Sequence, residues 1–179
     1  MRKVVVSEFL TLDGVMDDPG GSDGTPNGGW SFRVESTEDN MKFKFDELLA
    51  ADALLLGRKT YEGFAAAWPT MEGTGAFGER MNGLPKYVVS TTLKKLEWNN
   101  SRLIDKNVVE AVTKLKQEPG QDILVFGSGA LTQTQSMTSK LRIGIPRLMS
   151  TKRTARIPSQ LTCLGLIALR STLALKTTA

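Results

Sequence analysis

The chain has 179 residues, 40% of them hydrophobic and 23% charged, which is the composition of one ordinary globular domain. With one cysteine and no histidine, it lacks the residues for an intrachain disulfide, for most zinc sites and for histidine-based catalysis. The amino-terminal apolar run is too short for a signal peptide, and no stretch reaches the roughly 18 apolar residues of a membrane span. We therefore expect a cytoplasmic protein with no membrane partner and no bound metal.

The net charge of +4 is distributed unevenly along the chain. All 19 acidic residues lie between Glu8 and Asp122, so residues 1–131, with 15 basic side chains, carry 15 − 19 = −4. The remaining 48 residues carry eight basic side chains, no acidic one and no aromatic ring to stack on a base. The basic character therefore belongs to the carboxyl-terminal segment. We therefore expect no nucleic-acid partner. The alternative is that the carboxyl-terminal segment is a native basic arm that binds nucleic acid.

The first part of the chain predicts a strand, a long loop and a helix. The segment 4–10 is short and mostly apolar, as in a buried strand, and an Asp-Gly turn follows it at residues 13–14. Residues 17–29 are rich in glycine, proline and aspartate, and predict a loop whose length is typical of a functional segment. Ser36 or Thr37 is the expected cap of a helix.

Apolar segments then alternate with helices. Strands are predicted at residues 53–57, 86–90, 102–104 and 122–127, helices at 58–68 and 108–116, a glycine-rich loop around 73–78 and a last helix opening at 127–129. The strands are apolar throughout instead of alternating with polar residues, which is typical of a mainly parallel sheet covered by helices on both faces. We therefore predict the α/β class, with a three-layer α/β/α architecture.

Three predicted strands end in residues that suit a phosphate, and ligands bind at such ends. Gly57-Arg58-Lys59-Thr60 combines a helix N-terminus with a guanidinium fork, Ser90-Thr91 supplies hydroxyl groups, and Gly127-Ser128-Gly129 supplies backbone N–H groups. Each of these motifs could instead be a simple turn or cap. Asp13, at the end of the first strand, is a candidate for moving a proton or only for forming a turn.

Taken together, these residues resemble the dihydrofolate-reductase-like superfamily, in particular the reductase domain of bacterial riboflavin biosynthesis. The resemblance covers residues 1 to about 133, where four blocks agree in order and spacing. The blocks are Val6-Ser7-Glu8-Phe9-Leu10-Thr11-Leu12-Asp13-Gly14-Val15, Leu54-Leu55-Leu56-Gly57-Arg58-Lys59-Thr60-Tyr61-Glu62, Pro85-Lys86-Tyr87-Val88-Val89-Ser90 and Asp122-Ile123-Leu124-Val125-Phe126-Gly127-Ser128-Gly129.

The resemblance implies NADPH as the cofactor and a chain that is often dimeric. By matching position, it implies that Gly57-Arg58-Lys59-Thr60 holds a cofactor phosphate and that Ser90-Thr91 lies near the adenosine 2′-phosphate. It further implies that Gly127-Ser128-Gly129-Ala130 lines the pyrophosphate and nicotinamide. Leu12-Asp13-Gly14 would face the nicotinamide and the substrate, with Asp13 as the candidate catalytic residue.

The implied activity is hydride transfer from NADPH to a small pyrimidine- or pterin-like substrate. In the riboflavin enzymes this substrate is 5-amino-6-(5-phosphoribosylamino)uracil, whose sugar is reduced to a ribityl chain. Val15 stands where those enzymes tend to carry a lysine. The sequence therefore does not decide between a pyrimidine-like and a pterin-like substrate. Without a histidine, the proton must come from Asp13, another carboxyl group, a lysine or water.

Residues 135–179 depart from the family and form an atypical, acid-free part of the same domain. Asp and Glu make up about half of a typical charged content of about 25%, so such a segment is improbable in an ordinary domain. We hypothesise a frameshifted or otherwise replaced carboxyl terminus, with residues 141–145 or 161–169 as a substitute strand for an open sheet edge. The alternative to a working reductase is then a nucleotide-binding or structural domain without turnover.

Overall fold

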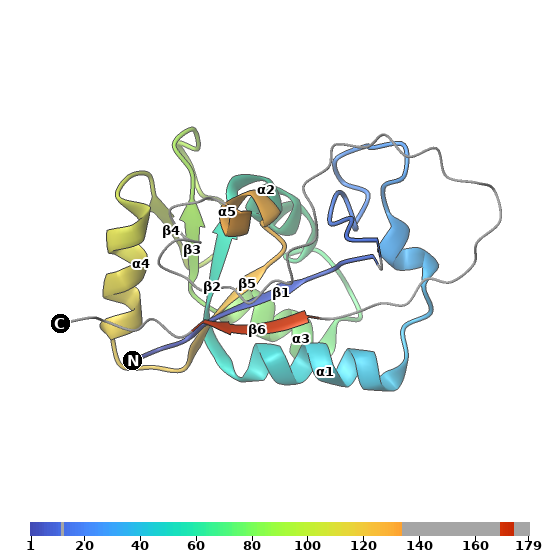
Figure 1. Ribbon diagram of the computed structural model, residues 1–179, viewed down its shortest axis with the longest axis horizontal. Helices are drawn as coiled ribbons and strands as arrows, with labels where there is room; N and C mark the ends of the chain where they lie inside the picture. Colours follow the sequence, from blue (N-terminus) through green and yellow to red (C-terminus); the bar gives the residue numbers. More distant parts are fainter. Residues whose placement is uncertain (12, 134–168, 174–179) are drawn as a thin grey trace.

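The structure is a computed structural model that describes residues 1–11, 13–133 and 169–173. Its centre is a six-stranded sheet with the strand order β4-β3-β2-β5-β1-β6 (Figure 1). Neighbouring strands pair in parallel except at one edge, where β6 runs antiparallel to β1. The strands are β1 (Val4–Glu8), β2 (Ala51–Gly57), β3 (Lys86–Val89), β4 (Ser101–Ile104), β5 (Asp122–Phe126) and β6 (Leu169–Leu173).

Helices cover both faces of this sheet, which confirms the predicted three-layer α/β/α fold. In Figure 1, α1 and α3 lie together on one side of the strands and α4 lies on the other. Within the described residues, no helix has the length and apolar character needed to cross a membrane. The helices are η1 (Trp30–Arg33, a 3₁₀ turn), α1 (Glu38–Leu49), α2 (Arg58–Ala67), α3 (Gly75–Gly83), α4 (Val108–Gln117) and α5 (Gly129–Gln133).

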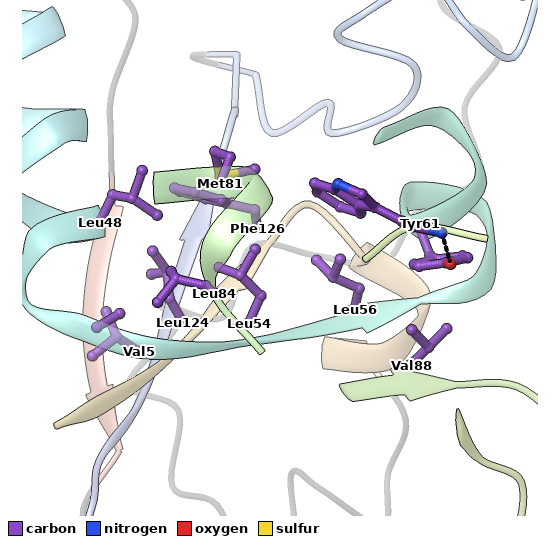
Figure 2. Packing of buried hydrophobic residues seen from close by; sticks show 12 residues of the cluster. Val5, Leu48, Leu54, Leu56, Tyr61, Met81, Leu84, Val88, Leu124 and Phe126 are labelled. Carbon is purple, nitrogen blue, oxygen red and sulfur yellow. Dashed lines mark hydrogen bonds between the residues drawn. The ribbon is translucent and has the colours of Figure 1, made fainter. Parts of the chain in front are cut away.

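Alternate residues of β2 point into two separate hydrophobic clusters, which explains why this strand is apolar throughout. Leu54 and Leu56 face the cluster shared with α1, α2 and α3, while Leu55 faces the cluster shared with α4 and α5. Figure 2 shows the first cluster, where Leu48 and Met81 pack over the strands. Burying a side chain of this size stabilises the fold by roughly 1.5–3 kcal/mol, so the two clusters hold the three layers together.

The predicted glycine-rich loop after α2 is wrong in part, because Gly75–Gly83 forms α3. Each glycine lowers helix stability by about 1 kcal/mol relative to alanine, which is why the composition predicts a loop. Met81 is completely buried and Phe77 packs against the same cluster. Burial of this apolar face on the sheet outweighs the poor helix propensity of the glycines.

The first long helix begins where the sequence predicts. Thr37, one of the two candidate caps, accepts the backbone N–H of Asn40 at 3.2 Å. Of its apolar residues, Leu48 is buried whereas Met41 and Leu49 are exposed. Only part of the apolar surface of this helix therefore packs on the sheet.

The edge strand β6 pairs with β1 in the register Glu8↔Leu169 to Val4↔Leu173. It begins at the last residue of the predicted substitute strand 161–169, whose other residues lie outside the described part of the chain. The second candidate strand, residues 141–145, also lies outside it, as does most of the atypical segment 135–179. The replaced-terminus hypothesis therefore stays a prediction.

Candidate nucleotide site

Two neighbouring strands send their following helices to opposite faces of the sheet. β2 leads into α2, whose Tyr61 packs in the first cluster, whereas β5 leads into α5, whose Leu131 packs in the second. Figure 1 shows α2 and α5 beside one another beyond the ends of the two strands. Open α/β sheets bind their ligands in the crevice at such a switch point. The motifs predicted at 57–60 and 127–130 both lie here.

Hydrogen bonds tie the two motifs to each other. The backbone N–H of Gly57 donates to Ser128 Oγ at 2.8 Å, and the backbone N–H of Ser128 donates to Thr60 Oγ1 at 3.0 Å. Ser128 Oγ in turn donates to the carbonyl oxygen of Phe126 at 3.2 Å. Two motifs on different strands thus form one site, with Gly129 and Ala130 opening α5 beside it.

The backbone at this junction adopts a conformation that favours glycine. Gly127 has φ = 56° and Ser128 has φ = 64°, both in the left-handed region. A Cβ atom added at Gly127 would lie 3.3 Å from the side chain of Thr60. A side chain at position 127 would therefore be strained and would also crowd the contact between the two turns.

The first turn of α2 carries two basic side chains on the surface. Arg58 Nη1 lies 2.9 Å from Glu62 Oε2, with both side chains 45% exposed, and Lys59 Nζ lies 3.0 Å from Asp23 Oδ2. Surface pairs of this kind contribute about 0–1 kcal/mol, so Arg58 can exchange its carboxylate partner for a phosphate. The first N–H groups of a helix lack partners within that helix and favour an anion beside them.

The loop predicted at residues 17–29 is organised around the side chain of Asp18. This carboxylate accepts the backbone N–H groups of Asp23 and Thr25, each at 3.0 Å, and the bond from Asp23 is the main reason that the pKa of Asp18 is lowered. The ion pair between Asp23 and Lys59 joins the loop to the start of α2. The loop therefore contacts the start of α2, next to the motif at 57–60, and its functional role stays a prediction.

Ser90 and Thr91 lie at the end of β3, one strand beyond β2. Ser90 is buried, and its Oγ accepts the backbone N–H groups of Thr92 and Leu93 at 3.1 and 3.0 Å. This is the turn-capping role that the sequence left open as the alternative. Thr91 is exposed, so of the two residues it is the one whose hydroxyl is at the surface for a ligand.

Asp13 and Gly14 form a tight turn after β1. The Thr11 hydroxyl bonds to Asp13 Oδ1 and accepts the N–H of Val15 at 2.8 Å, and Gly14 has φ = 87°. Asp13 thus has the geometry of a turn residue, which is the alternative that the sequence left open for it. Its side chain is exposed. Leu12, the third residue predicted to face the nicotinamide, lies outside the described residues.

A buried polar cluster that the sequence did not single out lies at the end of β1. Ser7 Oγ donates to Glu47 Oε2 at 2.7 Å, and Lys44 Nζ donates to Ser7 Oγ and lies 3.4 Å from Glu47 Oε2. The ammonium group also lies 5.2 Å from the ring centre of Phe9 and 5.5 Å from that of Phe126. From the sequence alone, Ser7 belongs to the end of a strand and Lys44 and Glu47 to the surface of a helix. Their spacing along the chain does not predict that they are in contact.

Glu8 follows Ser7 in β1, and its Oε1 atom is buried without a hydrogen-bond partner in the described part of the chain. Burial raises the pKa of Glu8 to about 8, although the positive charge of Lys44 acts in the opposite direction. Strongly perturbed carboxyl groups are candidates for functional residues. Among the described residues, no group of three or more His, Cys, Asp or Glu side chains is placed to hold a metal ion.

The fold and the site define a nucleotide-binding α/β domain of the dihydrofolate-reductase type. The family model of the RibD C-terminal domain matches residues 2–138. The chain therefore belongs to this family, the nucleotide-binding reductase domain of riboflavin biosynthesis, and the predicted resemblance is confirmed. The match ends close to the predicted limit near residue 133.

The chain also has a distant relative of known sequence. The chain is similar to uncharacterized protein YyaP of Bacillus subtilis (strain 168), with 29% identity over 136 residues. The match covers 74% of this chain and 66% of YyaP, so the chain spans just under two thirds of that relative. Because YyaP is uncharacterized, this similarity indicates no activity.

Proposed function

We propose that the chain is an NADPH-dependent reductase that transfers a hydride to a small pyrimidine- or pterin-like molecule. The observation that carries the proposal is the pair of turns joined by Ser128 at the switch point, with Arg58 beside them. Its membership in a reductase-type family supports the same activity. The riboflavin precursor is the substrate class that the family suggests first.

The residues at the crevice fit a dinucleotide. A Cβ atom at Gly57 would lie 3.5 Å from Ser128 Cβ, and one at Gly127 would lie 3.3 Å from Thr60, so side chains at either position would fill the space between the turns. Glycine at both places lets a pyrophosphate approach the backbone closely. When bound, NADPH supplies the hydride, while the protein supplies position and electrostatics.

Each part of the site then has a role. Arg58 and the first N–H groups of α2 bind cofactor phosphate, because a charge-assisted hydrogen bond contributes about 1.5–3 kcal/mol. The end of β1 is joined to the β5 turn by the bond from Gly127 N–H to the carbonyl oxygen of Ser7, at 3.4 Å. On this proposal, the residues that follow β1, including Asp13, form the wall against which the substrate lies.

The binding test compares two variants of one ion pair. We expect Arg58→Gln to weaken NADPH binding about ten- to a hundredfold, as the loss of one charged hydrogen bond predicts, measured by titration of NADPH fluorescence. Glu62→Gln removes the carboxylate that holds Arg58 at 2.9 Å but keeps the guanidinium. This control should bind NADPH at least as tightly as the wild type.

Turnover is tested separately from binding. Purified protein is mixed with NADPH and pyrimidine or pterin substrates, and oxidation is followed by the loss of NADPH absorbance. Substrate-dependent oxidation supports the reductase. Tight NADPH binding without oxidation of either substrate class would instead support a nucleotide-binding domain without turnover, and a lack of NADPH binding would contradict the proposal as a whole.

A further inference from the structure

β1 and β5 are a second pair of neighbouring strands whose following helices lie on opposite faces of the sheet, and Glu8 is the last residue of β1. β1 leads to α1 on the face of the first cluster, whereas β5 leads to α5 on the face of the second. The carbonyl oxygen of Ser7 accepts the N–H of Gly127, so Glu8 follows directly after the point where β1 meets the β5 turn. Neighbouring strands lie about 4.8 Å apart, so a ligand held at the β2 and β5 ends that extends across β5 would come to the end of β1, where Glu8 lies.

The carboxyl group of Glu8 lies on a different face of the sheet from the polar cluster. Val4 and Val6 pack in the cluster of α4 and α5, and Val5 packs in the cluster of α1. By strand alternation, Glu8 stands on the face of α5 and Ser7 on the face of α1. The ammonium of Lys44 is already bonded to Ser7 Oγ on that other face, which agrees with the unpartnered Oε1 of Glu8.

Charged residues of two described elements, α1 and β6, neighbour the end of β1. On α1 they are Lys44 and Glu47, which contact each other at 3.4 Å. On β6, Arg170 stands opposite Ser7 in the ladder. The sequence of α5, Gly129–Gln133, contains no titratable residue, and neither does β5 beyond Asp122. Burial thus outweighs the positive charge of Lys44, and Glu8 keeps its proton at neutral pH because its pKa is about 8.

We propose that Glu8 exchanges a proton in step with the redox state of the dinucleotide bound across β5. This inference rests on the proposed function. Glu8 keeps its proton beside the neutral, reduced nicotinamide and releases it when the site holds the cationic, oxidised form, because an opposite charge stabilises the carboxylate. In turnover the O–H bond of Glu8 breaks, its electron pair stays on the carboxylate, and the proton goes to the oxygen or nitrogen of the substrate whose carbon receives the hydride. Water then returns a proton to Glu8.

The test measures proton release on binding, without any substrate. Calorimetric titrations in two buffers of different ionisation enthalpy give the protons released per dinucleotide at about pH 7. NADP⁺ and NADPH share the 2′-phosphate, so the difference between them isolates the nicotinamide. We expect NADP⁺ to release about half a proton or more beyond NADPH in the wild type, from a pKa decrease of about 1–3 units beside a cation. The difference should vanish in Glu8→Gln.

Two controls keep the result interpretable. In the wild type at about pH 9.5 the difference should also vanish, because Glu8 is then ionised before binding, and this comparison needs no variant. Glu72→Gln, an exposed carboxyl group elsewhere, should leave the difference intact. Persistence of the difference in Glu8→Gln, or its loss in Asp13→Asn instead, would overturn the inference. Equal proton release by the two dinucleotides overturns the inference alone, whereas absence of binding by both overturns the proposed function with it.

Discussion

The hydroxyl of Ser128 accepts the backbone N–H of Gly57 at 2.8 Å, from a residue 71 positions earlier in the chain. Ser128 holds a left-handed backbone, which costs a residue with a side chain roughly 1–2 kcal/mol. Its bonds to Gly57 and Thr60 offset that cost. The geometry of the turn at the end of β2 therefore depends on the turn at the end of β5, and neither is complete alone.

This dependence can be tested at Thr60. Thr60→Val keeps the shape of the side chain but leaves the Ser128 N–H, now bonded at 3.0 Å, without its acceptor. We expect the free energy of unfolding to fall by about 1–3 kcal/mol and NADPH binding to weaken about tenfold. Urea unfolding and fluorescence titration measure the two effects. Thr60→Ser keeps the oxygen, and a similar loss in that variant would contradict this explanation.

Lys86 is buried completely yet fully hydrogen-bonded. Its ammonium donates to the carbonyl oxygens of Asn82, Leu84 and Asn99 at 2.6, 2.8 and 3.1 Å, and lies 4.3 Å from the ring centre of Trp98. Lys86→Met leaves three carbonyl groups without a donor. We expect the free energy of unfolding to fall by about 2–4 kcal/mol, measured by urea unfolding. A change below about 1 kcal/mol would show that water replaces the ammonium.

The same lysine should give the stability a pH dependence. Burial lowers the pKa of Lys86 from 10.5 to about 8, so between these values the unfolded chain binds a proton that the folded chain does not. Stability therefore rises with pH across this window. The wild type should gain on the order of 2 kcal/mol relative to Lys86→Met between about pH 7.5 and 10.5. A constant difference between the two unfolding curves would contradict the assignment.

Gly120 adopts φ = 152°, and a side chain there would overlap the carboxylate of Asp52. That carboxylate is paired with Arg2 and accepts the N–H of Gln121 at 2.8 Å, while Arg2 Nε donates to the Gln121 carbonyl oxygen at 2.8 Å. We expect Gly120→Ala to lower the free energy of unfolding by about 2 kcal/mol. Gly83→Ala, where a Cβ meets nothing within 4 Å, is the matched control and should cause no loss.

The loop at residues 17–29 should loosen when its central acceptor is removed. Asp18→Ala deletes the bonds to the backbone N–H groups of Asp23 and Thr25. We expect faster hydrogen exchange at these two amides, measured by NMR, with the exchange of β2 unchanged. Asp17→Ala removes a neighbouring exposed carboxyl group and should leave both amides protected. Equal exchange in the two variants would show that Asp18 does not organise the loop.

Much of the fold can be predicted from the sequence because the strands and helices carry local signals. The run Asp122–Phe126 is apolar and flanked by glycines, and Val108–Gln117 buries Val112 and Leu115 at helical spacing. The helix Gly75–Gly83 could not be predicted, since its stability comes from the contact of Met81 with distant strands. Local propensity contains no information about such contacts.

The candidate site divides in the same way. Glycines at strand ends mark 57–60 and 127–130, because a turn and a close backbone approach leave a local trace. The bond between Thr60 and Ser128, and the bond between Ser7 and Lys44, join residues that are distant along the chain. A lysine on a helix and a serine near the end of a strand are ordinary in isolation. Only the packing of α1 against the end of β1 makes them a cluster.

The most direct test of the central claim is a fluorescence titration of the wild-type chain and of Arg58→Gln with NADPH. We expect saturable binding of one NADPH per chain, weakened about ten- to a hundredfold in Arg58→Gln and unchanged or tighter in Glu62→Gln. The absence of saturable binding by the wild type, or equal affinity in Arg58→Gln, would contradict a cofactor site at the joined ends of β2 and β5.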